Sequence, residues 1–367
     1  MVVRVLFGLV VAASLLAGIV GGLVRAGWPL PIEASAWLTQ AVVAHAFLMV
    51  CGFLGTVIGI ERAVAVKRAW SFAAPAASGG AGVLALAGHS AAAAALAVFA
   101  AAVFVLVNVI VVARQRASHT GLLLMAALVW LAANLGHALD LLRAAVVPLW
   151  LAFLVLTIAA ERLEMARLMR RSARAGVALY AALAVMLGGA ILSSVSGWGG
   201  VTYGAGLFGL ALWLLTFDIA RRTVVARGLS RYMAICLLLG HGWLALSGLA
   251  WAATSLGLPW RDAALHALAL GFVFSMIFGH APVILPAVAR VKLHFSAAFY
   301  APLALLHVSL AWRLFLAPLA PDYARTGSAI NAAAIGLFVL TVAGSALAWR
   351  IKYSSIDRPH HEHPVRH

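Results

Sequence analysis

Apolar runs of about 20 residues, the length that a helix needs to cross the hydrocarbon core of a bilayer, follow one another along the chain. Only structures that satisfy their own backbone hydrogen bonds can cross lipid, and these runs are too long and too uniformly apolar for barrel strands. Hydrophobic residues make up 65% of the sequence, more than a soluble core could bury. The sequence therefore predicts an all-α, polytopic membrane protein. The twelve expected transmembrane helices cover residues 3–24, 35–60, 71–89, 91–113, 120–142, 146–168, 175–196, 200–222, 231–256, 262–289, 296–317 and 327–350.

The net charge of +16 would suit a nucleic-acid partner, but the positions of the basic residues favour a membrane topology. With the N-terminus on the inner side, 21 of the 26 Lys and Arg residues fall on that side. This asymmetry is the positive-inside rule. We expect a multi-pass protein of a bacterial-type inner (plasma) membrane, with both termini cytoplasmic and no nucleic acid bound. The first run is too long for a typical signal peptide, so we expect it to remain as a helix.

The chain is expected to form one transmembrane domain over residues 1–350, followed by a polar, His-rich cytoplasmic tail over 351–367. The tail ends in HHEHPVRH, and we expect it to be solvated. The two cysteines, Cys51 and Cys236, both fall inside expected spans. They predict small apolar side chains in packing positions and no disulfide framework.

A repeat of four helices relates three of the expected spans. Span 35–60 leads into IGIERAVAVKR and span 146–168 contains TIAAERLEMAR, so two Glu-Arg pairs stand 100 residues apart. Span 262–289 opens with LHALAL (265–270), which echoes AHAFLM (44–49) in span 35–60. The repetition predicts three four-helix arcs around a pseudo-threefold axis. A six-plus-six transporter repeat would instead pair span 35–60 with span 200–222, which has no matching histidine.

Six histidines lie within expected spans, where an ionisable group is costly and usually faces the bundle interior. A single one would be explained by a hydrogen bond between helices, but six make that explanation incomplete. Neutral imidazole is a common ligand of metals and haem. The six are His45, His137, His241, His266, His280 and His307.

Depth separates these histidines into groups. His45 lies ~15 Å, and His266 ~6 Å, from the outer start of its helix, so both fall in the outer half of the membrane. Such a pair suits bis-histidine ligation of a haem, and Arg261 and Arg313 are placed at the outer surface to meet its propionates. His241 and His307 fall near mid-depth and are candidates for a second metal site.

His280 lies about 40° round the helix from His266 and ~21 Å deeper, if the helix is regular. It is a further candidate metal ligand. Met49 and Met276 each stand one turn from a histidine and could supply soft ligands to copper, although core filling is the favoured interpretation of both.

Glu61 and Glu161 fall where their expected spans leave the membrane, at a depth similar to that of His280. One interpretation is an inner gate or a site of proton uptake. The other, which we favour, is a salt-bridged and snorkelling pair that fixes the inner end of each arc. A regular helix would place Glu61 about 160° from His45, on a different wall.

The stretches AHAFLMVCGFLGT (44–56), LHALALGFVFSMIFGHA (265–281) and LLHVSLAWRL (305–314) resemble the NnrS family. Members of that family are twelve-helix, haem- and copper-containing membrane proteins associated with nitric oxide metabolism and nitrosative stress. The broader pattern resembles subunit I of the haem-copper oxidases, in which three four-helix arcs surround the cofactors and helices 2 and 10 ligate a low-spin haem. The resemblance implies a b-type haem held by His45 and His266, and it allows copper.

The sequence departs from the oxidases at their copper site, which needs a histidine on helix 6 and a His-His pair after helix 7. The spans 146–168, 175–196 and 200–222 contain no histidine. A standard terminal oxidase is therefore not expected, while another haem-dependent oxidoreductase remains open.

The alternative function is a proton-coupled secondary transporter of a small solute, since GHAPVILP (279–286) would interrupt its helix. His280 and the two Glu residues would then be its coupling groups. An assembly or stress-tolerance factor without turnover is a third alternative.

Overall fold

The computed structural model describes residues 2–29, 35–166, 172–317 and 319–354, and within these residues every element is a helix. Elements η1 and η3 are π-helices, and η2 and η4 are short 3₁₀ helices. In chain order the elements are α1 (Val2–Arg25), α2 (Ala36–Val43), α3 (His45–Phe47), η1 (Leu48–Gly55), α4 (Thr56–Val66), η2 (Ala69–Phe72), α5 (Ala73–Leu86), α6 (Ser90–Arg114), α7 (Ser118–Ala138), α8 (Arg143–Met165), α9 (Ala173–Leu192), α10 (Trp198–Phe217), α11 (Ala220–Thr223), α12 (Leu229–Ser255), α13 (Arg261–His266), η3 (Ala267–Phe274), α14 (Ser275–Val288), η4 (Ala297–Phe299), α15 (Tyr300–Leu316) and α16 (Pro321–Ser354).

Twelve helical segments of the described chain are long and apolar enough to cross a membrane, which confirms the predicted all-α polytopic fold. Several span ends differ from expectation by a few residues, for example Phe217 instead of 222 and Pro321 instead of 327. The second span continues through α4 to Val66, so Glu61 and Arg62 lie inside the helix and not at its exit. The last span, α16, continues to Ser354, past the expected domain end at residue 350. The rest of the expected tail, residues 355–367, lies outside the described residues.

The three spans that the repeat relates are the most deeply buried ones. In the most apolar window of each span, 83% of the residues are buried for Arg143–Met165, and 61% for both His45–Val66 and Arg261–Val288. Helix α4 contacts α14, and α8 contacts η3. The second, sixth and tenth spans thus meet at the centre, as three four-helix units around an axis would require.

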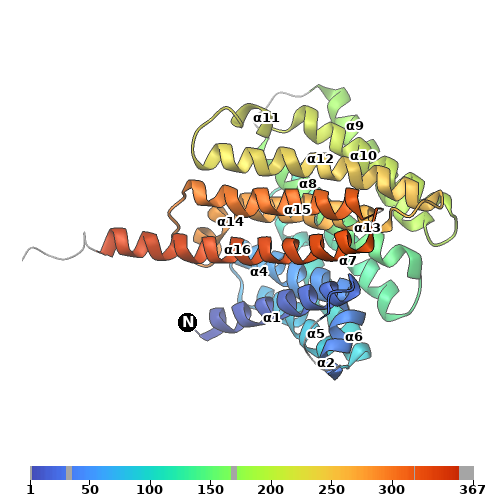
Figure 1. The fold of residues 1–367 in the computed structure, drawn as a ribbon, viewed down its shortest axis with the longest axis horizontal. Coiled ribbons are helices and arrows are strands. Elements are labelled where there is room, and N and C mark those ends of the chain that lie inside the picture. The colour runs from blue at the N-terminus through green and yellow to red at the C-terminus, as the bar shows by residue number, and fades with distance from the viewer. Residues whose placement is uncertain (1, 30–34, 167–171, 318, 355–367) are drawn as a thin grey trace, which may run out of the picture.

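The helices run roughly side by side, and the remaining spans surround the central three (Figure 1). The N-terminus and the C-terminal end of α16 lie at the same end of the bundle. An even number of crossings produces this arrangement. We call the end of the bundle at which α4, α8 and α14 finish the inner end, and the opposite end, which carries α3 and α13, the outer end.

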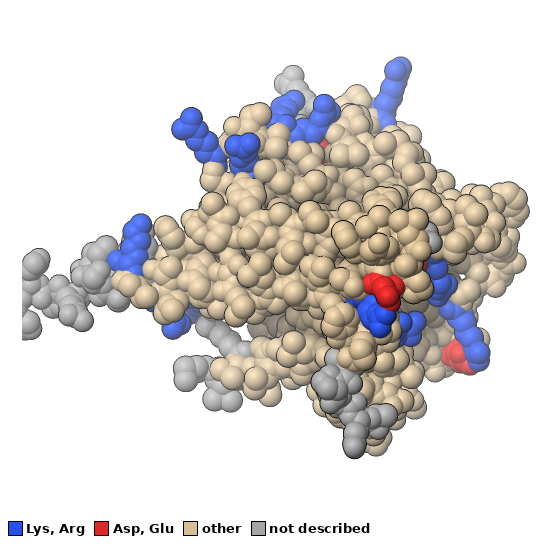
Figure 2. Space-filling model, viewed as in Figure 1, with Lys and Arg blue, Asp and Glu red and all other residues tan. Residues whose placement is uncertain are grey.

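Charged side chains gather toward the ends of the helices. In Figure 2, most Lys and Arg stand around the margins of the molecule or near the start of α16, while the surface over the middle of α12, α15 and α16 shows no charged atom. A band of this kind suits the hydrocarbon region of a bilayer, where an exposed charge would be costly.

Two π-helices interrupt the central spans. Each has eight residues, and η1 and η3 begin shortly after His45 and His266, respectively. A π-helix bonds each residue to the fifth residue along instead of the fourth, and π-segments are frequent at functional sites. The wider turn rotates everything beyond it. The angles of about 160° and about 40° expected from a regular helix therefore do not apply between residues on opposite sides of η1 or η3.

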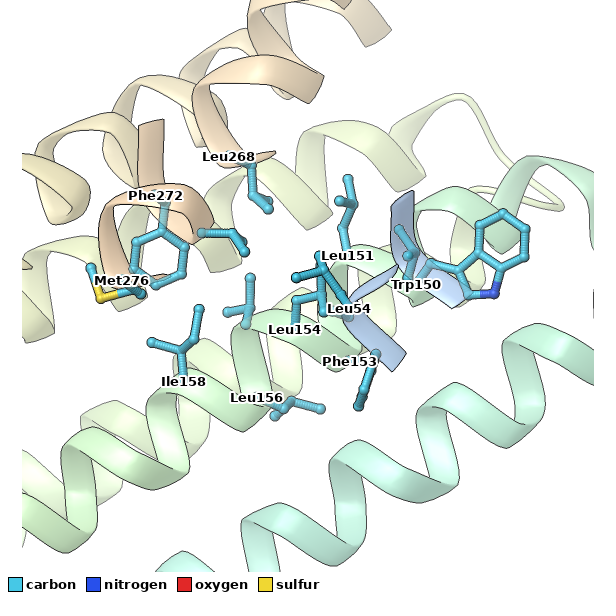
Figure 3. Close-up of a cluster of buried hydrophobic side chains, with 14 of the residues drawn as sticks. Leu54, Trp150, Leu151, Phe153, Leu154, Leu156, Ile158, Leu268, Phe272 and Met276 are labelled. Atoms are coloured by element: carbon cyan, nitrogen blue, oxygen red, sulfur yellow. The ribbon is translucent and has the colours of Figure 1, made fainter. Parts of the chain in front are cut away.

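The middle of the bundle, between η1, α8 and η3, is apolar. Leu54 of η1, Leu154 of α8 and Phe272 of η3 point into one buried cluster (Figure 3). Beside it, the rings of Phe53 and Phe274 stack with their centroids 6.2 Å apart, which joins the two π-helices directly. This cluster separates the histidines of the outer end from the ionisable residues of the inner end.

The buried cysteines fit the expectation of packing positions. Cys51 is fully buried, and its thiol donates to the side-chain oxygen of Asn134 at 3.2 Å, while Ser78 donates to the Cys51 carbonyl at 2.6 Å. Cys236 is also fully buried and free, and it packs against Gly279. Each thiol therefore fills space between helices.

Candidate functional site

His45 begins the short helix α3 at the outer end and packs against a glycine face of α1. Its Nδ1 lies 2.7 Å from the carbonyl oxygen of Gly18. Gly22 lets the imidazole come close, because a Cβ built on it would lie 2.8 Å from Cε1 of His45. The sulfur of Met49 packs in the same way against Gly18, which supports a filling role for this methionine.

A carbonyl oxygen can only accept a hydrogen bond, so Nδ1 of His45 must carry the proton. The lone pair of this neutral imidazole is then on Nε2. Metal-ligating histidines characteristically donate their other ring N–H to a carbonyl or a carboxylate, which fixes the ring and the tautomer. His45 is therefore held in the form that a ligand needs.

His266 ends helix α13, and its Nδ1 lies 2.7 Å from a carboxylate oxygen of Asp262, one turn earlier. An ionised carboxylate is also an acceptor only, so Nδ1 again carries the proton. Nη2 of Arg313 lies 3.2 Å from Nδ1 and 3.4 Å from Nε2. Because a guanidinium can only donate and Nδ1 already carries the proton, the acceptor of this long contact is Nε2.

His45 and His266 both lie at the outer end, and His45 lies within electrostatic reach of His266 and of the guanidinium groups of Arg25 and Arg313. The stacked π-helices that follow the two histidines hold their helices side by side. Two imidazoles of the same tautomer thus stand on neighbouring central helices, with arginines nearby.

The arginines predicted to meet propionates differ in their surroundings. Arg313 is buried and donates two hydrogen bonds to Asp262, at 2.9 and 2.7 Å, so this carboxylate already balances its charge. Arg261, beside Asp262, is exposed. Within the described residues, the hydrogen bond of Arg25 of α1 is a long one of 3.5 Å to the carbonyl of Val42. Arg25 and Arg261 are therefore better placed than Arg313 to meet an anionic group.

His307 has the opposite tautomer and two partners. The indole N–H of Trp243 donates to its Nδ1 at 2.7 Å, so the ring proton is on Nε2, 3.3 Å from Ser275 Oγ. Both nitrogens are used, and the imidazole stacks on Trp243 with centroids 6.2 Å apart. These contacts support a role in joining α12, α14 and α15.

His241, its expected partner in a second metal site, has different neighbours. It is fully buried on α12, and within the described chain neither ring nitrogen has a hydrogen-bond partner. Its Nε2 lies 3.8 Å from a carboxylate oxygen of Asp218. Among the described residues no three His, Cys, Asp or Glu side chains gather as a metal-binding group, so this geometry adds no support for copper.

His280 lies at the inner end, far along its span from His266. Its Nδ1 lies 2.7 Å from the carbonyl of Met276, and Arg162 donates to its Nε2 at 2.6 Å. The Nε2 lone pair is therefore occupied by a guanidinium. His280 belongs with the Glu-Arg pairs, and the site at the outer end has two histidines, not three.

Two further features were not found from the sequence. Asp262 fixes His266, and its position four residues earlier on the same helix face was a usable signal. A half-open cavity of about 320 Å³ lies beside α3, between α7 and α8, and its wall includes His137, Asp140 and Trp150. Nothing in the spacing of those residues indicated a cavity.

Comparison with known proteins gives one finding about the family. The family model described as "Domain of unknown function (DUF8744)" matches residues 4–347. No curated protein and no solved structure matches the chain. Because the match covers far more than half of the chain, from the first span into the twelfth, the chain belongs to the DUF8744 family.

Proposed function

We propose that the chain is a haem-binding integral membrane protein that acts in redox or nitric oxide-related metabolism or stress, similar to NnrS proteins. The proposal places it in a bacterial-type inner membrane with both termini cytoplasmic. His45 and His266 are the proposed axial ligands of a b-type haem. The resemblance to the NnrS family remains a prediction of the sequence.

One observation carries this proposal. On neighbouring central helices, two imidazoles have Nδ1 bonded to an acceptor, Gly18 O and Asp262 Oδ1. His45 leaves its Nε2 lone pair for a ligand bond, and at His266 a ligand would displace only the 3.4 Å contact from Arg313. The donor set fits haem iron, which accepts imidazole nitrogen. A bound haem would supply one-electron chemistry, and its potential would be set by these ligands and their partners.

The chain contributes orientation and charge to this site. Gly18 and Asp262 hold the two rings and make the imidazoles better donors. Arg25 and Arg261 supply positive charge at the outer surface. The apolar cluster between η1, α8 and η3 keeps water from the inner side of the site. His280 and His307 are not alternative ligands, because their acceptor nitrogens are used within the protein.

The test is the optical spectrum of the full-length protein purified in detergent from haem-replete cells. We expect a Soret band with bis-histidine character, lost or strongly weakened in His45→Ala and His266→Ala. His89→Ala is the matched control, because His89 is exposed at the start of α6. Colourless wild-type protein with no iron by elemental analysis, or a spectrum unchanged in both ligand variants, would refute the proposal.

A proton-coupled secondary transporter is the second candidate. It is favoured by the interruptions in two central spans, at Ala44 before α3 and at the π-helices, because transporter sites commonly lie at discontinuous helices. Uptake of a solute into proteoliposomes driven by a proton gradient, by protein free of haem, would support it. Uptake that is lost in His280→Gln and retained in His45→Ala would assign the coupling to the inner end.

A further inference from the structure

Ionisable side chains occupy matching positions on the three central helices at the inner end. Thr56 follows η1 directly and Ser275 follows η3 directly, and each hydroxyl donates to the carbonyl four residues earlier. Glu61 lies five residues after Thr56, and His280 lies five residues after Ser275. With Glu161, the counterpart of Glu61 in the sequence repeat, one proton acceptor per central helix therefore stands at this level.

The two carboxylates share one guanidinium. Nη2 of Arg62 lies 2.7 Å from Oε1 of Glu61 and 3.2 Å from Oε1 of Glu161. All three side chains are largely buried, with 12% of the Arg62, 26% of the Glu61 and 22% of the Glu161 side chain exposed. One cation against two carboxylates leaves an excess negative charge, which a site within a membrane protein balances most simply by binding a proton.

The second arginine, Arg162, does not balance this charge by a direct contact. It is buried, with 4% of its surface exposed, and it donates to Nε2 of His280. A guanidinium does not give up its proton, so Nε2 must be the acceptor and His280 is neutral in this arrangement. Arg162 still lies within electrostatic reach of Glu161, its neighbour in sequence.

Other ionisable groups face this cluster. Glu164, also on α8, lies within electrostatic reach of Glu161 and stands 4.0 Å from His119. His241 of α12 lies within electrostatic reach of Arg162 and is 3.8 Å from Asp218. Ionisable side chains of α8 and α12 therefore adjoin the cluster formed by α4, α8 and α14.

Several buried polar atoms in this region have no hydrogen-bond partner among the described residues: Nε of Arg62, Nε of Arg162 and both ring nitrogens of His241. Buried polar groups are almost always satisfied, and internal water is the usual partner where protein groups are missing. The unsatisfied atoms stand beside the acid–imidazole cluster. Water at these atoms would connect the carboxylates with the imidazoles by hydrogen bonds.

We propose that Glu61, Glu161 and His280 form a proton-binding site that exchanges one proton with water at the inner face. In the first step, a proton from water or buffer forms an O–H bond on the carboxylate pair around Arg62, and the donor becomes its conjugate base. In the second, Arg162 leaves Nε2 of His280, the O–H bond breaks and an N–H bond forms at the lone pair that Arg162 has vacated. The imidazolium then repels Arg162, which binds the carboxylate that has become ionised again.

Because Arg162 has two alternative partners, the site can carry a proton and is not only a structural salt bridge. With the proton on the acid pair, Arg162 binds His280. With the proton on His280, Arg162 binds Glu161. The site does not depend on haem at the outer end, because the apolar cluster lies between them and no residue is shared.

The test is infrared spectroscopy of the full-length purified protein during a pH titration in H₂O and D₂O. We expect the C=O band of one buried carboxylic acid that shifts in D₂O and disappears as the pH rises. The band should be lost in Glu161→Gln or in Glu61→Gln, and its titration midpoint should shift in His280→Gln. Asp322→Asn is the control, because Asp322 is exposed and paired with Arg325 at the other end of the bundle.

Absence of a titrating acid band in the wild type at every pH would overturn the proposal, and this measurement needs no variant. A band that survives unchanged in the double Glu61→Gln, Glu161→Gln variant would overturn it as well. A midpoint unaffected by His280→Gln would remove the imidazole from the site and overturn the two positions proposed for Arg162. Each measurement can be made on haem-free protein, so its result is independent of the Soret test.

Discussion

Gly22→Ala tests whether the glycine face of α1 positions His45 for a ligand. A Cβ built on Gly22 lies 2.8 Å from Cε1 of His45, whereas ordinary contact begins at 3.4 Å. The imidazole must therefore move by roughly 0.6 Å, or α1 must retreat by as much. Metal–ligand bonds tolerate deviations of about 0.2 Å, so a shift of this size takes the ring out of ligand position.

The expected result follows from the hydrogen bond as well as the contact. Moving the ring away from Gly18 weakens the Nδ1–H bond at 2.7 Å that orients it. Loss of such a supporting partner typically lowers metal affinity by about 10- to 100-fold. We expect haem to dissociate from Gly22→Ala about 10- to 100-fold more readily than from the wild type, measured by transfer to an excess of a haem-scavenging protein.

Gly8→Ala is the matched control on the same helix, because a Cβ at Gly8 meets nothing within 4 Å. It should retain haem like the wild type, and alanine should if anything stabilise α1, by up to about 1 kcal/mol. Equal haem retention in Gly22→Ala, Gly8→Ala and the wild type would show that the position of His45 does not matter to the cofactor, and the proposed site would fail.

The remaining predictions concern stability and the second imidazole. Gly21→Ala should destabilise the protein by about 3 kcal/mol or more in a denaturant titration, because its Cβ would meet the backbone of α2 and cannot be accommodated by a side-chain rotation. Asp262→Asn should lower haem retention by about 10-fold or more, because the amide is a weaker partner for His266, and normal retention would contradict the assigned tautomer. Trp243→Phe should cost about 1–3 kcal/mol, because Nδ1 of His307 would lose its donor, while the Soret band stays unchanged.

The span pattern and the depth of most histidines could be predicted from the sequence, because both depend on local hydropathy and chain length. Twelve apolar runs give twelve spans, and a histidine ten residues into a run lies ten residues into a helix. The four-helix repeat also identified the three central spans, since the Glu-Arg pairs stand on helices that the fold buries most deeply. Predicting these features does not require knowing which side chains are in contact.

The partners of each histidine could not be predicted, because they come from other helices. Residue spacing could not indicate that Trp243 would occupy Nδ1 of His307, or that Arg162 would occupy Nε2 of His280. Those two contacts decide which imidazoles can bind a ligand. The tautomer of a buried histidine is therefore a property of the tertiary structure, and a census of histidines by depth overestimates the number of candidate ligands.

The π-helices limit what periodicity could predict about the two ends of the second and tenth spans. A period of 3.6 residues puts Glu61 on a different wall from His45, but it holds only when every residue bonds to the fourth along. Across η1 and η3 the bonding changes to the fifth, and the wide turn rotates the inner end of the helix relative to its outer end. Both spans contain a π-helix at the same place, between an imidazole on the outer side and a proton acceptor on the inner side. In both spans, a local change from α-helix to π-helix thus separates a histidine near the outer end from a proton acceptor, Glu61 or His280, near the inner end.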